Sequence, residues 1–348
     1  MGARMEAVLS AAGVNVPEDS VEVLRDGSPW YVLRASLSED ARHASVILKT
    51  CALTSREPEI TASLSGVLEC VPRVLRVGGG SGFRVMMLED FGRRGLYECA
   101  TPETYMEAVK VLGGIHRRFE GDSEQCTGIA GLVPPRGLTE WPASLQLIPT
   151  YGRKEWASTL AAAARLTSMR FADGTYRGTI SRGARRLPDS LKCLLRRSLD
   201  MLDDTWGRGL TMPSTLVHGD FHEGNILLRD GEGSPKFGLI DWGDARRDCG
   251  LIDLVSLIDV AHRMKTVKLD EEQVLSWYLA VRNGSSAQVT PEVQAEWNLA
   301  WVLRAWMELR WFADSGEDFG ERADREIGII GARLTALSGG LQCRWDSH

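Results

Sequence analysis

Hydrophobic and polar positions alternate through the N-terminal quarter of the chain in a way that predicts an antiparallel sheet. Residues 21–25 (Val-Glu-Val-Leu-Arg) show this alternation, and a turn containing Gly and Pro follows them. Such runs, bounded by turn residues, are typical of strands with one buried face. The strands that we predict on this basis cover residues 21–25, 30–34, 45–50, 71–77 and 83–88. Helices are predicted at 5–12 and 55–64, where Pro58 suits a first turn.

Beyond Thr101 the apolar residues recur at helical spacing instead. Residues 104–118 place their apolar side chains on one face, as an amphipathic helix does. Residues 120–150 are rich in Gly, Pro and Thr and are interpreted as loop. Further helices are predicted at 157–166, 188–202, 252–263, 271–283 and 291–313. The last of these carries four tryptophans, of which Trp297, Trp301 and Trp311 share a face while Trp306 points away. We expect most of them to belong to the core, while one or two could stack on a ring of a substrate.

A second pair of short strands is predicted near the middle of the chain. Residues 216–228 read Leu-Val-His-Gly-Asp-Phe-His-Glu-Gly-Asn-Ile-Leu-Leu, and a turn-forming stretch separates them from an apolar run that ends at Asp241. Two apolar runs joined by a Gly-containing turn predict a hairpin. A hairpin of this length brings its ends together, so Asn225 and Asp241 should lie side by side.

The residues at the base of this hairpin have the chemistry of a phosphoryl-transfer site. A carboxylate and an amide oxygen held together can bind Mg²⁺, which prefers oxygen ligands. Asp220 precedes Asn225 by five positions and could accept the proton of an attacking hydroxyl. The alternatives are polar capping of a loop, or a zinc cluster of a hydrolase formed by His218, Asp220 and His222. The zinc hypothesis leaves Asn225 and the hairpin without a role, and His222 alone is more typical of a scaffold residue.

This arrangement resembles the catalytic loop of protein kinases, followed by their magnesium-binding aspartate. With Gly219 after the histidine and a second histidine at 222, it is similar to the aminoglycoside phosphotransferase family of small-molecule kinases. In protein kinases an arginine after the histidine often reads a phosphate on the activation loop, and with Gly219 we expect no such switch. The resemblance implies an α+β, two-lobed protein-kinase-like fold. Its small antiparallel-sheet N-lobe would cover residues 1–92, ending in the hinge. The larger, mainly helical C-lobe would cover 93–348, with a variable acceptor segment at about 130–200.

The same resemblance implies a nucleotide site in the N-lobe. Lys49, at the end of the strand 45–50, would hold the α- and β-phosphates. Glu57 would pair with Lys49, with Glu59 as its rival. Ser28 in the first hairpin turn would cap the phosphates. Adenine would bind to backbone groups of the hinge, namely Met87, Leu88 and Glu89.

Two further acids follow the magnesium aspartate. The stretch 250–254 resembles an element of the family in which the aspartate, here Asp253, would bond to the backbone around the catalytic loop. Asp244 could contribute to substrate or metal binding, and a role in a turn explains it equally well.

The activity implied by the resemblance is transfer of the γ-phosphoryl of ATP, with Mg²⁺, to a hydroxyl of a small molecule. GTP is not excluded as the donor. The first candidate acceptor is an antibiotic, in resistance or in self-protection of a producer. The alternatives are a metabolic kinase for a sugar or an amino alcohol, and a nucleotide-binding pseudokinase. The complete set of Asp220, Asn225 and Asp241 argues against the pseudokinase.

Charge along the chain bears on the acceptor. Residues 153–186 contain eight basic side chains and two acids, whereas a site for a polycationic aminoglycoside should be acidic. This segment therefore favours a neutral or anionic acceptor, unless it faces away from the pocket as a solvated surface. Residues 308–326 contain seven acids and three arginines. These acids either line the acceptor pocket, as the resemblance implies, or form a solvated face.

Composition limits the other classes of function. The formal net charge of −6 and the pI near 5.7 argue against a nucleic-acid-binding surface. No apolar run reaches the length of a membrane span, and the N-terminus lacks the apolar core of a signal peptide. The seven cysteines are scattered and include no CxxC, which fits reduced thiols better than disulfides or zinc. We therefore expect a soluble cytoplasmic protein, and its oligomeric state is left open.

Overall fold

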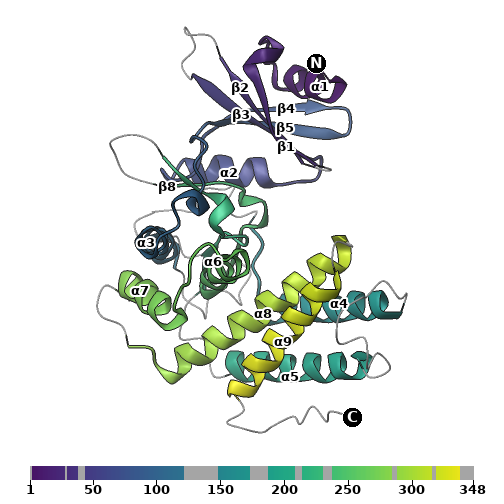
Figure 1. Cartoon of the computed structure of the whole chain (residues 1–348), viewed down its shortest axis with the longest axis vertical. Helices are drawn as coiled ribbons and strands as arrows, with labels where there is room; N and C mark the ends of the chain where they lie inside the picture. The colour runs from purple at the N-terminus through teal and green to yellow at the C-terminus, as the bar shows by residue number, and fades with distance from the viewer. Residues whose placement is uncertain are drawn as a thin grey trace, which may run out of the picture.

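The structure, a computed structural model, describes residues 2–27, 30–37, 44–120, 148–172, 187–207, 214–229, 237–283, 288–315 and 319–337. A five-stranded antiparallel sheet lies at one end of the molecule and a larger helical part at the other (Figure 1). This is the α+β, two-lobed arrangement predicted from the sequence, and the fold class is confirmed. We call the sheet with its two helices the N-lobe, and the elements from α3 onwards the C-lobe.

The N-lobe sheet is built from sequence-adjacent hairpins. Its strands follow the order β1-β2-β3-β5-β4, and all neighbours are antiparallel. Their bounds are β1 (Val21–Asp26), β2 (Tyr31–Ser36), β3 (Ser45–Ala52), β4 (Val74–Gly80) and β5 (Phe83–Glu89). Helix α1 (Ala3–Ala12) packs against β3, β4 and β5. Helix α2 (Glu57–Ser65) lies on the C-lobe side of the sheet (Figure 1) and contacts the turn that follows Asp241.

The two faces of this sheet have different roles. Val8 and Leu9 of α1 pack with Leu33, Leu48 and Val85 of the sheet into a small apolar core. Because side chains alternate along a strand, the residues adjacent to Leu48 and Val85 point to the opposite face. The N-lobe therefore buries one face for stability and presents Lys49 and its neighbours on the other.

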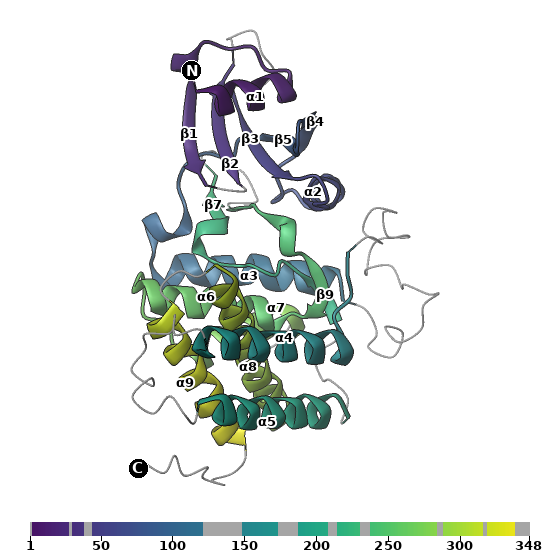
Figure 2. The ribbon, with the colours of Figure 1, turned by 90° about the vertical axis from the view of Figure 1, so that its right-hand side faces the viewer.

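The C-lobe is a helical assembly that surrounds α8 (Pro291–Ser315). This helix packs against α4, α5, α6 and α9 (Figure 2). The other helices of the described residues are α3 (Pro102–Arg118), α4 (Arg153–Ala172), α5 (Leu187–Gly207), α6 (Leu251–Met264), α7 (Glu271–Asn283) and α9 (Phe319–Leu337). Helix α9 was not predicted from the sequence, because its acid-rich first half masks its apolar positions.

The tryptophans of α8 are buried by this central position. Trp297, Trp301 and Trp306 are buried although they point to different sides of the helix, and Trp306 Nε1 donates a hydrogen bond to Ser198 Oγ of α5 at 3.0 Å. Trp311, near the end of α8, is 54% exposed. The three tryptophans predicted to lie on one face, Trp297, Trp301 and Trp311, therefore differ in burial. Neighbouring helices cover α8 for most of its length but leave Trp311 exposed.

Two acids of the 308–326 stretch are also buried, so these two do not belong to a solvated face. Glu308 on α8 pairs with Arg304, and Glu326 on α9 pairs with its neighbour Arg325 at 2.5 Å. Arg325 also reaches Asp259 of α6 at 2.5 Å. Ion pairs therefore run along α8 and join α9 to α6.

Glu326 should make the stability of the protein fall between about pH 5 and pH 8. Burial and the charge of Asp259 raise the pKa of Glu326 from 4.5 to about 7, although Arg325 opposes them. The folded state therefore binds this proton more tightly than the unfolded state. The resulting stabilisation is fully present below pH 4.5 and is lost as the pH rises through about 7, a change of at most about 3 kcal/mol.

The Glu326→Gln variant tests this expectation, because Gln stays neutral at every pH. The melting temperature of the variant, relative to that of the wild type, should rise between pH 5 and pH 8. Asp259, Arg325 and Glu308 face residue 326 in both proteins, so the comparison isolates the proton of Glu326. A constant difference in melting temperature across this range would contradict the raised pKa.

Two short antiparallel pairs carry the central motif. Strand β6 (Ser214–Val217) pairs with β9 (Arg246–Cys249), and β7 (Ile226–Leu228) pairs with β8 (Phe237–Leu239). The predicted hairpin is thus present, with Ile226 opposite Leu239. Among the described helices, none combines the length and the apolar character needed to cross a membrane.

Candidate active site

The loop between β6 and β7 is held in place by a buried carboxylate. Asp253 on α6 accepts hydrogen bonds from the backbone N–H of His218 at 2.7 Å and of Gly219 at 2.9 Å. Gly219 has φ 88°, and a Cβ there would collide with the carbonyl oxygen of Asp244. Only glycine suits this position, so the local sequence and Asp253 together fix the path of the catalytic loop.

Asp220 is the half-buried carboxylate of this loop. Its Oδ2 lies 3.3 Å from His222 Nε2 and accepts a hydrogen bond from Asn225 Nδ2 at 3.3 Å. Burial acts to raise the pKa of Asp220, but His222, Arg304 and His218 outweigh it and hold the pKa well below its usual range. Asp220 is therefore a carboxylate at neutral pH, with 37% of its side chain exposed.

The hairpin brings Asn225 to the strand end that precedes Asp241. The backbone N–H of Ile240 donates to the carbonyl of Asn225 at 3.0 Å. The amide nitrogen of Asn225 donates to the carbonyl of Asp220 at 2.9 Å, which leaves the amide oxygen without a partner among the described residues. Asp241 adopts φ 66°, a left-handed conformation that is uncommon for a non-glycine residue.

These oxygen donors fit Mg²⁺. Mg²⁺ in kinase sites is held by one or two protein ligands together with phosphates and water, so the amide oxygen of Asn225 and a carboxylate oxygen of Asp241 suffice. The part of the chain that the structure describes contains no cluster of three or more His, Cys, Asp or Glu side chains arranged to bind a metal by themselves. The assignment of Asn225 and Asp241 as metal ligands remains a prediction.

Lys49 connects the N-lobe to this site. Its Nζ lies 2.6 Å from Glu57 Oε1 and 2.7 Å from Asp241 Oδ1. Burial acts to lower the pKa of Lys49, but the two carboxylates outweigh it and raise the pKa, so the ammonium stays charged. Glu59, the rival partner, pairs with Arg84 at 2.5 Å instead. The structure thus brings Glu57, at the first position of α2, to the lysine.

The histidines of the loop are occupied by hydrogen bonds. His218 Nε2 lies 2.9 Å from the carbonyl oxygen of Ile240, and its Nδ1 accepts from the N–H of Asp220 at 3.3 Å. His222 Nδ1 accepts from the N–H of Gly224 at 3.0 Å. A zinc ligand needs a free ring nitrogen, and His218 has none. This geometry disfavours the zinc hypothesis and gives both histidines a scaffold role.

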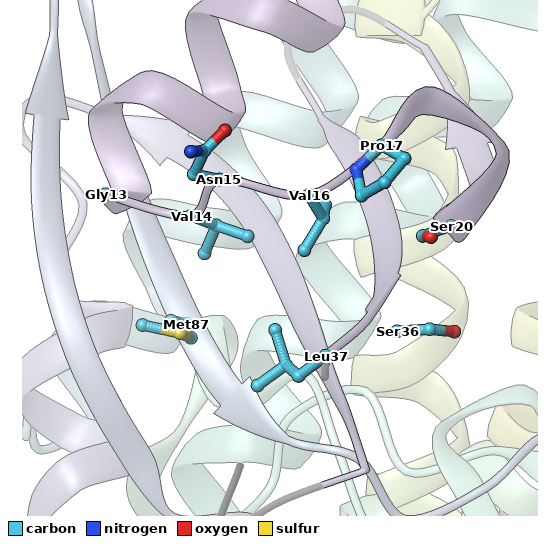
Figure 3. Close-up of a pocket in the computed structure, with 9 residues that line it drawn as sticks. All are labelled: Gly13, Val14, Asn15, Val16, Pro17, Ser20, Ser36, Leu37 and Met87. Atoms are coloured by element: carbon cyan, nitrogen blue, oxygen red, sulfur yellow. The ribbon is translucent and has the colours of Figure 1, made fainter. Parts of the chain in front are cut away.

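The predicted hinge residues do not all face the nucleotide side. In the ladder Met86 lies opposite Lys49, and the side chain of Met87 points to the other face, where it lines a pocket under the segment after α1 (Figure 3). Leu88 is buried, and the N–H of Glu89 donates to the carbonyl of Arg73 at 2.9 Å. The role of these backbone groups in adenine binding remains a prediction, and Ser28 lies outside the described residues.

A charged pair that sequence reasoning missed fixes the chain just after the predicted hinge residues. Arg34 of β2 donates to Asp90 through Nε at 2.6 Å and Nη2 at 3.0 Å, and to the carbonyl of Gly92 at 2.7 Å. Asp90 also accepts from Ser45 Oγ at 2.7 Å and from the N–H of Gly92 at 2.9 Å. The signal in the sequence was an arginine inside an otherwise apolar strand.

Replacing Asp90 with Asn should weaken ATP binding about tenfold, the equivalent of about 1.4 kcal/mol. The amide keeps the size of the side chain but loses charge-assisted hydrogen bonds to Arg34, so the hinge backbone would shift. The dissociation constant of MgATP, measured by calorimetry, checks this. Asp26→Asn is the matched control, because Asp26 forms an exposed ion pair in the same lobe. Equal affinities in the Asp90 and Asp26 variants would contradict a role for the pair.

The comparisons with known proteins agree with this geometry. Among solved structures, choline kinase from Cryptosporidium parvum Iowa II is 12% identical with a TM-score of 0.59, over 94% of this chain and 93% of that chain. Amicoumacin kinase hAmiN, in complex with AMP-PNP, Ca²⁺ and Ami, is 14% identical with a TM-score of 0.56, over 97% and 94%. An aminoglycoside-3'-phosphotransferase of type VIII is 20% identical with a TM-score of 0.51, over 86% and 98%. At these identities the likeness shows the fold.

Sequence comparison identifies the family. No curated protein sequence matches the chain significantly. The sequence profile of the phosphotransferase enzyme family matches residues 40–285, which include Lys49, Asp220 and Asp241. This match confirms the resemblance to aminoglycoside phosphotransferases and the predicted class of enzyme. The chain therefore belongs to the phosphotransferase enzyme family.

Proposed function

We propose that this protein transfers the γ-phosphoryl of ATP to a hydroxyl of a small molecule. The observation that carries the proposal is that Lys49, from the N-lobe sheet, meets Asp241 of the C-lobe at 2.7 Å while Glu57 braces it at 2.6 Å. Lys49 would bind the α- and β-phosphates. Asn225 and Asp241 would hold Mg²⁺, which when bound neutralises charge on the phosphate oxygens.

Asp220 would act on the acceptor. Its lowered pKa makes it a weak general base, because proton transfer is most efficient when the pKa of the base lies near the working pH. We infer that Asp220 mainly orients the hydroxyl and takes up its proton late, as the bond to phosphorus forms. Catalysis would then depend on positioning and charge compensation, which is characteristic of phosphoryl transfer.

The acceptor that we propose is neutral or anionic. A polycation would need unpaired carboxylates, but Glu308 of α8 and Glu326 of α9 are paired with arginines. Two arginines of the basic segment 153–186 lie on the surface. Arg153 on α4 is exposed and pairs with Asp203 of α5 at 2.5 Å, and Arg165 is exposed as well. The basic residues from 177 to 186 lie outside the described residues. The first candidate for the acceptor is a hydroxylated antibiotic, because amicoumacin kinase hAmiN shares the fold.

A metabolic kinase is the second candidate. The choline kinase of Cryptosporidium parvum shares the fold over 94% of this chain, so the same scaffold serves a small metabolite. Choline carries a positive charge, which would need an unpaired carboxylate to bind it. Because Glu308 and Glu326 are paired with arginines, we favour an uncharged metabolite. A sugar or another uncharged alcohol fits that condition.

Product mass after incubation with Mg-ATP tests the proposal. The panel should include aminoglycosides, neutral and acidic nucleoside antibiotics, choline and sugars. We expect one phosphoryl group to be added to a neutral or anionic compound by the wild type, and by Asp200→Ala, which removes an exposed carboxylate of α5. Asp220→Ala should lose the activity. Transfer that survives in Asp220→Ala, or no transfer to any compound while ATP is bound, would overturn the proposal.

A further inference from the structure

The two carboxylate oxygens of Asp220 have different surroundings. Oδ2 is engaged by His222 and Asn225, each at 3.3 Å. Oδ1 has no hydrogen-bond partner among the described residues. The nearest cation to Oδ1 is Arg304 of α8, whose Nη2 lies 3.9 Å away. Oδ1 is therefore the oxygen that remains available to an acceptor hydroxyl, and a guanidinium flanks it.

Arg304 is buried deeply for a charged side chain. It is 6% exposed, and its Nη2 lies 2.5 Å from Oε1 of Glu308, one helical turn further along α8. Glu308 Oε2 lies 3.1 Å from Arg263 Nη1 of α6. The Nε of Arg304 has no hydrogen-bond acceptor among the described residues. Glu308 thus fixes one edge of the guanidinium, and the same Nη2 faces Asp220.

Structural stability alone explains this arrangement poorly. Removing a guanidinium from water is costly, and a buried ion pair is often no more stabilising than apolar residues of similar size. The carboxylates of Glu308, Asp259 and Glu326 also face Arg304, but each of them has a second arginine partner, Arg263 or Arg325. A charge kept at this position, with one nitrogen unpaired, is better explained by what it does to Asp220.

We propose that Arg304 is a positioning residue for Asp220, which rests on the proposed function of that carboxylate. At 3.9 Å the guanidinium attracts Oδ1 without forming a hydrogen bond, so it holds the carboxylate in place and leaves the oxygen free to accept. His222 and Asn225 fix the other oxygen. The carboxylate is thereby held from both sides with one oxygen directed at the acceptor.

The test compares Arg304→Met and Arg304→Lys with Arg310→Met, which removes an exposed arginine of the same helix. Arg304→Met should lower kcat about 100-fold, the loss typical of a small misplacement of a reacting group. The KM for ATP should stay within about twofold, because Arg304 does not contact the nucleotide side. Arg304→Lys should recover part of the loss, and Arg310→Met should behave as wild type. Wild-type kcat in a folded Arg304→Met variant would overturn the proposal.

A double-mutant cycle separates positioning from a general structural effect. If Arg304 acts through Asp220, adding Arg304→Met to Asp220→Asn should lower the residual rate by less than about twofold. Equal losses in both backgrounds would overturn the proposal. Should Arg304→Met fail to fold, Glu308→Gln provides the same comparison, since it releases the anchored guanidinium. An inactive wild type would refute the proposed function, whereas an active wild type with unaffected variants would refute only the role of Arg304.

Discussion

Replacing Asp241 with Ala should lower kcat for ATP-dependent phosphoryl transfer by about 1,000-fold or more, and should abolish the dependence of nucleotide binding on Mg²⁺. The substitution removes a carboxylate that we assign to the metal and that also lies 2.7 Å from Lys49. Loss of one preorganised electrostatic contact commonly lowers a rate by about 100- to 1,000-fold, and Asp241 supplies more than one. Rates of product formation and calorimetric titrations of ATP with and without Mg²⁺ provide the measurement.

The control for this variant is Asp200→Ala, which should keep full activity. Asp241 also holds an uncommon left-handed backbone conformation, which Asp tolerates better than Ala does, so the melting temperature of the variant is measured beside its activity. A loss of activity without a loss of stability would therefore separate the chemical role of Asp241 from a structural one. Full activity in Asp241→Ala would refute its assignment.

Replacing Asp253 with Asn should lower both stability and activity. Asp253 is fully buried and accepts from His218 and Gly219 of the catalytic loop, and its Oδ2 lies 3.3 Å from His116 Nε2. Burial acts to raise the pKa of Asp253, but His116 and the other donors outweigh it and lower the pKa. Asn has the same shape, but it replaces one accepting oxygen with an NH₂ group that opposes a backbone N–H. We expect a loss of about 3 kcal/mol in the free energy of unfolding.

Activity should fall further than the loss of folded protein explains. The path of the catalytic loop depends on these two hydrogen bonds, and a shift of about 1 Å in Asp220 can lower kcat about 100-fold. Denaturant unfolding and kcat, measured at a temperature where the variant is fully folded, separate the two effects. Asp270→Asn, at an exposed helix N-terminus, is the control for stability. A folded Asp253→Asn variant with wild-type kcat would show that the loop is held without the carboxylate.

The parts of the site that local sequence determines could be predicted. The hairpin that brings Asn225 next to Ile240 follows from two apolar runs and a turn, and Lys49 ends an alternating strand. Pro58 marked the start of α2, which agreed with the preference for Glu57 over Glu59 that the family resemblance implied. Each of these depends on neighbours within a few residues, where periodicity and turn chemistry carry most of the information.

The contacts between distant elements could not be predicted. Arg34 and Asp90 are 56 positions apart, and Arg304 reaches Asp220 across the packing of α6 and α8. In the sequence, Arg34 and Arg304 are each a single charge within a mostly apolar stretch. A surface-exposed residue gives the same pattern, so the pattern does not reveal the contact. The environment of Glu326 could not be predicted for the same reason, because only the packed structure shows that it faces Asp259 and Arg325 rather than water.

Gly219 has a consequence for how such an enzyme could be controlled. An arginine at this position would have to adopt φ 88°, and its Cβ would meet the carbonyl of Asp244. The phosphate-reading residue of regulated protein kinases therefore cannot be acquired here by a single substitution. Lys49 is joined directly to Glu57 and Asp241, so the protein would be competent as soon as it folds. Its output would then depend on how much of it the cell makes and on how much acceptor it meets.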